Sequence, residues 1–211
     1  MFKNLSKGIR ILFVSQVMFL AYMSAVIIGS AMKRIEIAEV IFKNPLSGMT
    51  GTLGPGIFIM IWGVVMGMAG FILAVWGLHF CARDDGRFKS LLGASLIELF
   101  ALLGAHIGGG PGLAAKVVCS LMELVIGAGS ILWICENLNR AGYDQLAEKG
   151  KPLITVYLIL FFCENAVTVL GVVGIHRGPI LGFIGLSVLA LCIYYFFGYL
   201  SFLSSTVKAL E

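Results

Sequence analysis

Two carboxylates with nearly the same neighbours, Glu98 and Glu123, are the residues of this chain whose type and position could support chemistry. Each lies in the middle of an apolar stretch, in the contexts Ser95-Leu-Ile-Glu98-Leu99 and Ser120-Leu-Met-Glu123-Leu124. Gly110 and Pro111 separate the two stretches, and each acid lies 12 residues from this pair. A helical hairpin turning there would therefore bring both acids to the same depth. A third acid, Glu164, lies midway along a later apolar stretch.

Carboxylates at the centre of a bilayer are costly, by about 2.5–3.5 kcal/mol each on insertion scales, and usually mark a functional site. Two acids at one level also repel each other, so we expect the pair to be protonated or to share a proton or a cation. The pattern predicts a substrate- or proton-binding site formed by Glu98, Glu123 and Glu164. A second interpretation stays open, because protonated acids also form hydrogen bonds that hold neighbouring helices together.

The composition indicates that these acids lie in a membrane. The 211 residues are 59% hydrophobic and 12% charged, with a mean hydropathy of +1.00. Soluble domains contain about 25% charged residues. Apolar runs of roughly 20 residues, which is the length needed to cross a bilayer, occupy most of the chain. We therefore predict a single transmembrane domain over residues 1–211, with the lipid bilayer as its main partner.

Six apolar stretches predict an all-α, polytopic membrane protein with six transmembrane helices in three hairpins. The predicted spans are about 11–32, 57–80, 90–107, 113–134, 153–174 and 180–203. Ten of the fifteen Lys and Arg residues fall on the side that holds both termini, which favours an N-in/C-in topology. Each outer turn carries Gly-Pro before a helix, at 54–55, 110–111 and 178–179. Proline fits the first turn of a helix, so this recurrence fits either internal triplication or independent selection of one helix start.

Three further patterns concern the helices and their connections. Residues 35–42 place Glu36 and Glu39 among apolar residues at helical spacing, which predicts a helical extension of the first span. Residues 143–149 predict a short helix that Gly150 and Pro152 end before the fifth span. Glycines at 63, 67 and 70 form a small-residue stripe, which favours close helix contact within the bundle over dimerisation.

The remaining features argue against other classes of protein. The formal charge of +4 comes from basic residues beside the apolar stretches, so we expect no nucleic-acid partner. The five cysteines have no paired spacing, so no metal site or disulfide is predicted. The sequence contains no nucleotide-binding loop and no HExxH, GxSxG or CxxC motif. We therefore predict no catalytic residues, no cofactor and no enzymatic activity.

Two segments on the predicted inner side carry a resemblance. They are Ala82-Arg-Asp-Asp-Gly-Arg-Phe-Lys89 and Gly142-Tyr-Asp-Gln-Leu-Ala-Glu-Lys-Gly-Lys151. In these segments, and over roughly the middle half of its length, the chain resembles small six-span membrane proteins that are common in Gram-positive bacteria and largely uncharacterised. The resemblance implies a multi-pass protein of the bacterial cytoplasmic membrane, and it implies no particular activity.

Together these patterns favour a membrane transporter or transporter subunit. It would bind a cation, a proton-coupled solute or a small organic substrate at the acids near the middle of the membrane. The alternative is a non-transporting membrane scaffold or partner subunit whose buried acids only bridge helices. Either hypothesis allows a membrane partner subunit or a second copy of the chain as a further partner.

Overall fold

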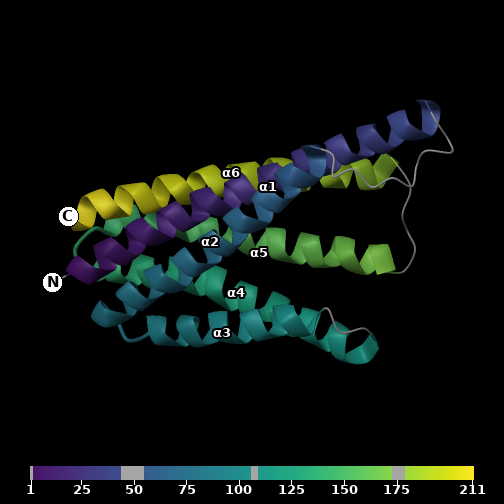
Figure 1. Ribbon diagram of the computed structural model, residues 1–211. Coiled ribbons are helices and arrows are strands. Elements are labelled where there is room, and N and C mark those ends of the chain that lie inside the picture. The colour runs from purple at the N-terminus through teal and green to yellow at the C-terminus, as the bar shows by residue number, and fades with distance from the viewer. Residues whose placement is uncertain (1, 44–54, 106–108, 173–178) are drawn as a thin grey trace. The chain divides into compact units, whose positions relative to one another are not determined.

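A computed structural model describes the main chain of residues 2–43, 55–105, 109–172 and 179–211. It describes the side chains of the same residues except those of 33–43, 109, 164, 167–172 and 179–186. The described residues form six helices and no strand (Figure 1): α1 Lys3–Lys43, α2 Pro55–Asp84, α3 Phe88–Gly104, α4 Gly109–Arg140, α5 Asp144–Val172 and α6 Pro179–Leu210. Among them, four stretches are long and apolar enough to cross a membrane, namely 3–32, 55–84, 110–140 and 187–210. The all-α prediction is confirmed.

The helix starts and one helix end follow the local chemistry. Pro55 and Pro179 are the first residues of α2 and α6, and Pro111 lies in the first turn of α4. Proline is favoured there because the first N–H groups of a helix have no partner within it. Between α4 and α5, Gly142 has a φ of 82°, a left-handed conformation that glycine adopts without strain. The predicted extension of the first span is confirmed, because α1 is helical as far as Lys43.

The prediction that Gly150 and Pro152 end a helix is wrong. Helix α5 runs through both residues without a break, with Pro152 inside it. Proline in a helix interior costs about 3 kcal/mol, because it removes a hydrogen bond to the residue four positions earlier. Here that residue is Glu148, which is exposed, so its carbonyl can bond to water. Packing also holds this turn, since a Cβ at Gly150 would overlap Cys135 Sγ and lie 2.9 Å from the Phe202 ring.

The described chain divides into two compact units, residues 11–77 and residues 1–10 with 78–211. In the first unit, α1 and α2 touch through glycines. A Cβ at Gly63 would lie 2.9 Å from the Ala25 Cβ, and one at Gly67 would lie 3.2 Å from the Tyr22 ring. Gly29 of α1 is tighter still, with 2.7 Å to a backbone oxygen of α2. The predicted glycine stripe therefore makes a helix contact within the chain.

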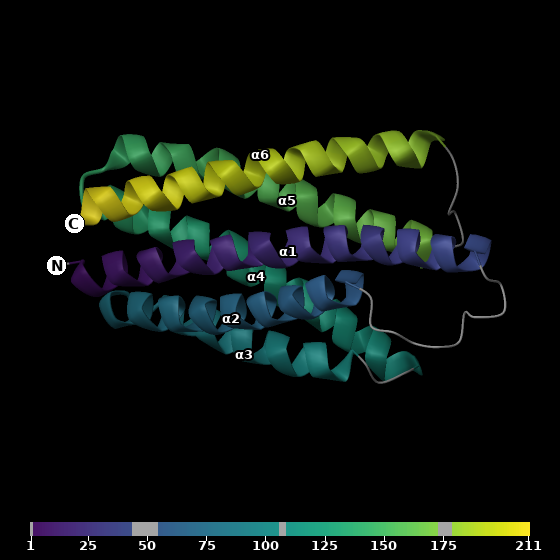
Figure 2. The same cartoon turned by 45° about the horizontal axis from the view of Figure 1, so that its top comes forward.

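In the second unit, residues 1–10 with 78–211, each helix packs against the next: α3 on α4, α4 on α5 and α5 on α6. Both termini lie at the same end of this unit, which we call the terminal end (Figures 1 and 2). The largest fully buried apolar side chains gather there: Leu5, Ile9, Leu78, Phe88, Leu91, Ile131, Ile134, Leu138 and Leu203. Farther along the helices, large apolar side chains such as Phe100 and Phe162 are 71% and 65% exposed. An apolar surface of this kind suits a lipid environment.

The close contact at Gly29 leads to a test of the α1–α2 pairing. We expect Gly29→Ala to lower the free energy of unfolding by about 1–3 kcal/mol, because the new methyl group meets backbone and must push the helices apart. The matched control is Gly93→Ala in α3, where a Cβ meets nothing within 4 Å. That control should be neutral or stabilising by up to about 1 kcal/mol. Thermal unfolding in detergent measures both variants. Equal melting temperatures for Gly29→Ala and Gly93→Ala would contradict the close contact between α1 and α2 at Gly29.

Candidate functional site

The structure brings Glu98 and Glu123 together on neighbouring helices. Helices α3 and α4 pack against each other, with Glu98 half-buried on α3 and Glu123 exposed on α4. The two carboxyl groups lie within electrostatic reach of each other, and both lie within reach of the Cys119 thiol. Glu164 is on α5, but its side chain lies outside the described residues. The acid pair is thus placed, and the third predicted member is not.

Tyr157 joins α5 to α4 at the level of this acid pair. Its hydroxyl donates a hydrogen bond of 2.9 Å to the main-chain carbonyl of Glu123. Its ring fills the space over Gly127, where any Cβ would overlap the aromatic atoms. Glycine at this position therefore permits the close approach of the tyrosine. Sequence spacing did not identify Tyr157, because its partner is 34 residues away on another helix.

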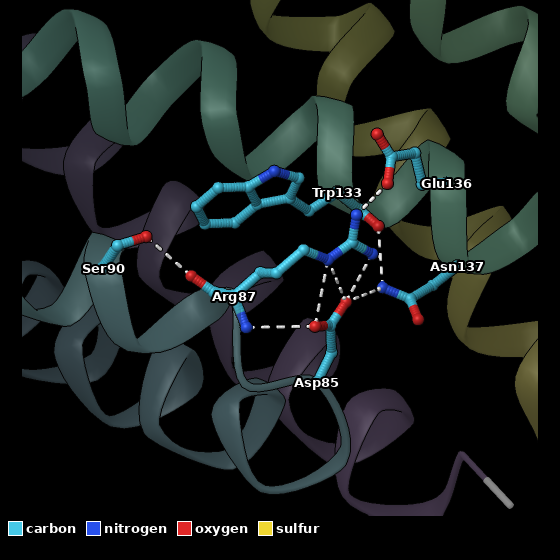
Figure 3. A network of polar contacts seen from close by, with 6 residues as sticks. All are labelled: Asp85, Arg87, Ser90, Trp133, Glu136 and Asn137. Carbon is cyan, nitrogen blue, oxygen red and sulfur yellow. Dashed lines mark hydrogen bonds and ion pairs between the residues drawn. The ribbon is translucent and has the colours of Figure 1, made fainter.

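A second group of polar residues lies at the terminal end of the unit (Figure 3). We call Asp85, Arg87, Glu136 and Asn137 the Asp85 cluster. The buried Asp85 carboxylate accepts hydrogen bonds from Arg87 Nη2 at 2.6 Å, from Arg87 Nε at 3.0 Å and from Asn137 Nδ2 at 2.8 Å. The Arg87 guanidinium also forms an ion pair with Glu136. The cluster thus joins the turn before α3 to the last turns of α4.

The electrostatics of the Asp85 cluster favour the charged carboxylate. The hydrogen bonds from the Arg87 side chain hold the pKa of Asp85 well below its usual range; burial opposes this shift, and the Asn137 hydrogen bond adds to it. The Arg87 main-chain N–H also bonds the same carboxylate, at 3.0 Å, which fixes the turn between α2 and α3. Asp85 is therefore an ionised, fully hydrogen-bonded tie between helix ends.

The neighbouring acid, Asp84, holds the start of α1. It accepts hydrogen bonds of 2.8 Å from the main-chain N–H of Leu5 and from the Asn4 side chain. A carboxylate at the first turn of a helix satisfies a free N–H group and interacts well with the helix dipole. Nearby, Lys7 Nζ lies 4.1 Å from the centre of the Phe80 ring. These contacts attach the N-terminal residues to the end of α2.

Asp84 and Asp85 lie in the predicted inner segment 82–89, and neither role was predicted from the sequence. Their partners lie as far as 80 and 52 residues away, so local spacing could not reveal them. A usable signal was present in the two adjacent acids that directly follow a long apolar helix. Near a membrane surface, such acids suit the free N–H groups and basic side chains of neighbouring helix ends.

The described residues contain no group of three or more His, Cys, Asp or Glu residues that could hold a metal ion. The cysteines are all free thiols. A pocket at the α4–α5 turn, lined by residues 142–146 and 149, lies apart from the acid pair.

Comparisons with protein families, with curated proteins and with solved structures find no match to this chain. The geometry of the acid pair and of the Asp85 cluster is therefore what indicates the function of the chain.

The Asp85 cluster predicts a stability difference between two acids. We expect Asp85→Asn to lower the free energy of unfolding by about 1–3 kcal/mol, because the part-buried donors of Arg87 and the buried donor of Asn137 lose a charged acceptor. Glu148→Gln is the matched control, since Glu148 pairs with Lys151 at the surface and such pairs contribute about 0–1 kcal/mol. Chemical unfolding in detergent, followed by circular dichroism, compares the two variants. Equal losses of unfolding free energy in the two variants would show that burial of the Asp85 cluster adds nothing to stability.

The lowered pKa of Asp85 also predicts an acid dependence of stability. Its folded-state pKa lies below its unfolded value, so the stabilising contribution is complete above the ordinary Asp pKa of about 3.9. The contribution is lost as the pH falls below that value toward the folded-state pKa. The difference in melting temperature between wild type and Asp85→Asn should therefore shrink as the pH falls below about 4. A difference that stays constant from neutral to acid pH would argue against this interpretation.

Proposed function

We propose that the chain is a six-span integral membrane protein of the bacterial cytoplasmic membrane that acts as a transporter or transporter subunit. Its site is the pair of acids Glu98 and Glu123, and the ligand is a cation, a proton-coupled solute or a small organic substrate. Glu164, midway along α5, is proposed as the third member. The observation that carries the proposal is the proximity of the two carboxyl groups on adjacent apolar helices.

The chemistry of a paired carboxylate supports this function. In a medium of low dielectric constant, two ionised carboxylates repel each other strongly, and a proton or a cation between them removes that repulsion. Protons on such a pair leave in two coupled steps that belong to the pair as a whole. A site of this kind can therefore take up and release a positive charge, which is the basic step of proton- or cation-coupled transport.

The proposed topology is supported by the position of the chain ends. Both termini lie at the terminal end of the unit formed by residues 1–10 and 78–211, as an even number of spans requires. Basic residues mark the same end of three helices, with Arg83 in the last turn of α2, Arg87 before α3 and Arg140 in the last turn of α4. Because Lys and Arg are enriched in cytoplasmic segments, we assign this end to the cytoplasm.

A scaffold or partner subunit is the second candidate, and the Asp85 cluster favours it. The hydrogen bonds of Asp84 and Asp85 connect helix ends, so this chain does use acids to hold helices together. Glu98 and Glu123 would then act in the same way at the middle of the helices. This candidate predicts acids that keep one protonation state under physiological conditions and whose isosteric amides leave the protein unchanged.

Infrared difference spectroscopy of the full chain in lipid films tests the proposal. We expect the C=O band of a protonated carboxyl group to appear as the pH is lowered through neutrality, and added Na⁺ or K⁺ to compete with it if the site binds a cation. Glu98→Gln and Glu123→Gln should each remove much of this band, because an amide cannot take up the proton.

Glu148→Gln is the control, since it removes an exposed carboxyl group and should leave the band in place. Circular dichroism shows whether each variant keeps its helices. If the double variant Glu98→Gln/Glu123→Gln is folded and gives the same band as wild type, the acid pair does not take up protons and the scaffold candidate is favoured.

A further inference from the structure

Helix α4 carries a polar stripe whose burial changes between the terminal end and the acid pair. Lys116, Glu123, Ser130 and Asn137 follow each other at intervals of seven residues, which places them on one face of the helix. Asn137 and Ser130, nearer the terminal end, are 3% and 5% exposed. Glu123 and Lys116, farther from it, are exposed. The same face of α4 is therefore closed near the terminal end and open from the acid pair onward.

Helix α6 loses its burial in the same direction. Like α4, it runs toward the terminal end (Figures 1 and 2). Thr206 and Tyr199 are buried there, whereas Cys192, seven residues before Tyr199 on the same face, is exposed. None of the described side chains of α4 between 113 and 129, or of α6 between 187 and 198, is buried. On both helices, burial ends before the half that carries Glu123 or Cys192 begins.

The exposed side chains of α4 differ in chemistry between its two faces. Leu121 and Val125, on the face opposite Glu123, are apolar and 48% and 46% exposed, which suits contact with lipid. Glu123 and Lys116 are ionisable, and ionisable side chains in spanning helices face the bundle interior or water. The stripe of Glu123 points into the second unit where it is buried, and at Glu123 it is exposed. Water, and not lipid, is the medium that suits this half of the stripe.

The terminal end is closed to water. Ile134 lies on the stripe between Ser130 and Asn137 and is fully buried, as are Ile131, Leu138 and Leu203. Beyond this apolar layer, the Asp85 cluster joins the turn before α3 to the last turns of α4. An apolar layer that the surrounding helices bury completely holds no water, so the acid pair is separated from the surface at the terminal end.

We propose that water reaches the Glu98–Glu123 site along the exposed half of the α4 stripe, from the end opposite the terminal end, and that the site takes a hydrophilic ligand from that side. This ligand is a proton or a hydrated cation, and its assignment rests on the proposed function. A ligand dissolved in lipid would instead meet α4 on its apolar face, at Leu121 and Val125. In the proposed topology the structure is thus open to the outside and closed to the cytoplasm.

The thiol of Cys119 provides the test, because it is half-buried on α4 within electrostatic reach of both acids. A membrane-impermeant trimethylammonium methanethiosulfonate forms a disulfide with a thiolate that water reaches, and methanesulfinate leaves. The reagent is added to one side at a time of sealed vesicles that hold the full chain, and tandem mass spectrometry identifies the modified cysteines. We expect Cys119 to react from the side opposite the terminal end only, and the buried Cys81 and Cys135 to react from neither side.

Three variants control this measurement. Lys208→Cys identifies the side of the terminal end, since Lys208 is exposed near the C-terminus. Leu121→Cys and Val125→Cys place thiols on the apolar face of α4 within a few residues of Cys119, and either serves if the other does not fold. We expect both to react at least about tenfold more slowly than Cys119, because thiolates do not form in lipid. Equal rates on the two faces, reaction of Cys119 from the terminal side, or no reaction from either side would overturn the proposed access.

Thiol modification and the infrared band separate the two proposals. If the carboxyl band depends on Glu98 and Glu123 but Cys119 does not react from the side opposite the terminal end, the access route is refuted and the acid site stands. If Cys119 reacts from that side but no band depends on the two acids, the route stands and the proposed function fails, and with it the assignment of the ligand. If neither result is obtained, both proposals fail.

Discussion

The charged turn between α2 and α3 is the constraint on which the rest of the second unit depends. Asp84 holds the first turn of α1, and Asp85 holds Arg87 before α3 and Asn137 near the end of α4. Four helix ends thus meet at two adjacent carboxylates. Asp85 is buried and its bonds satisfy donors that would otherwise be costly to bury, so its loss would leave several donors without an acceptor. The surrounding fully buried side chains strengthen these bonds by excluding water.

Hydrogen bonds and ion pairs between helix ends contribute more to helix association in a membrane than in water. Lipid tails are as apolar as the helix surfaces, so helices gain little from burying leucine or phenylalanine against each other. Association then depends on close packing at small residues and on polar bonds between helices. The chain uses both means, in different places: glycines join α1 to α2 in one unit, and carboxylates join the helix ends in the other. The exposed apolar side chains along the helices need no protein partner if lipid covers them.

Features that depend on local chemistry could be predicted from the sequence. The helices, the prolines at their starts and the glycine contact all follow from short-range patterns, and the structure contains them. The break predicted at Pro152 was wrong, because packing of Gly150 against Cys135 and Phe202 overrides local propensity. The bonds of Asp84 with Asn4, of Asp85 with Asn137 and of Tyr157 with the Glu123 main chain could not be predicted, since each joins helices distant in sequence. The proximity of Glu98 and Glu123 was predictable only because their helices follow each other closely in the sequence.

The Asp85 cluster also determines the relative height of the acid pair. Glu98 lies 11 residues beyond Arg87 on α3, and Glu123 lies 13 residues before Glu136 on α4. At 1.5 Å per residue, these distances are roughly 16.5 and 19.5 Å, so the acids differ in height by only about 3 Å. Both distances start from the ion pair of Arg87 with Glu136, which holds the start of α3 beside the last turns of α4. A slide of α3 against α4 would separate the acids and break that ion pair together. A movement that separates the two acids while keeping the cluster intact must therefore occur at the ends of α3 and α4 opposite the cluster.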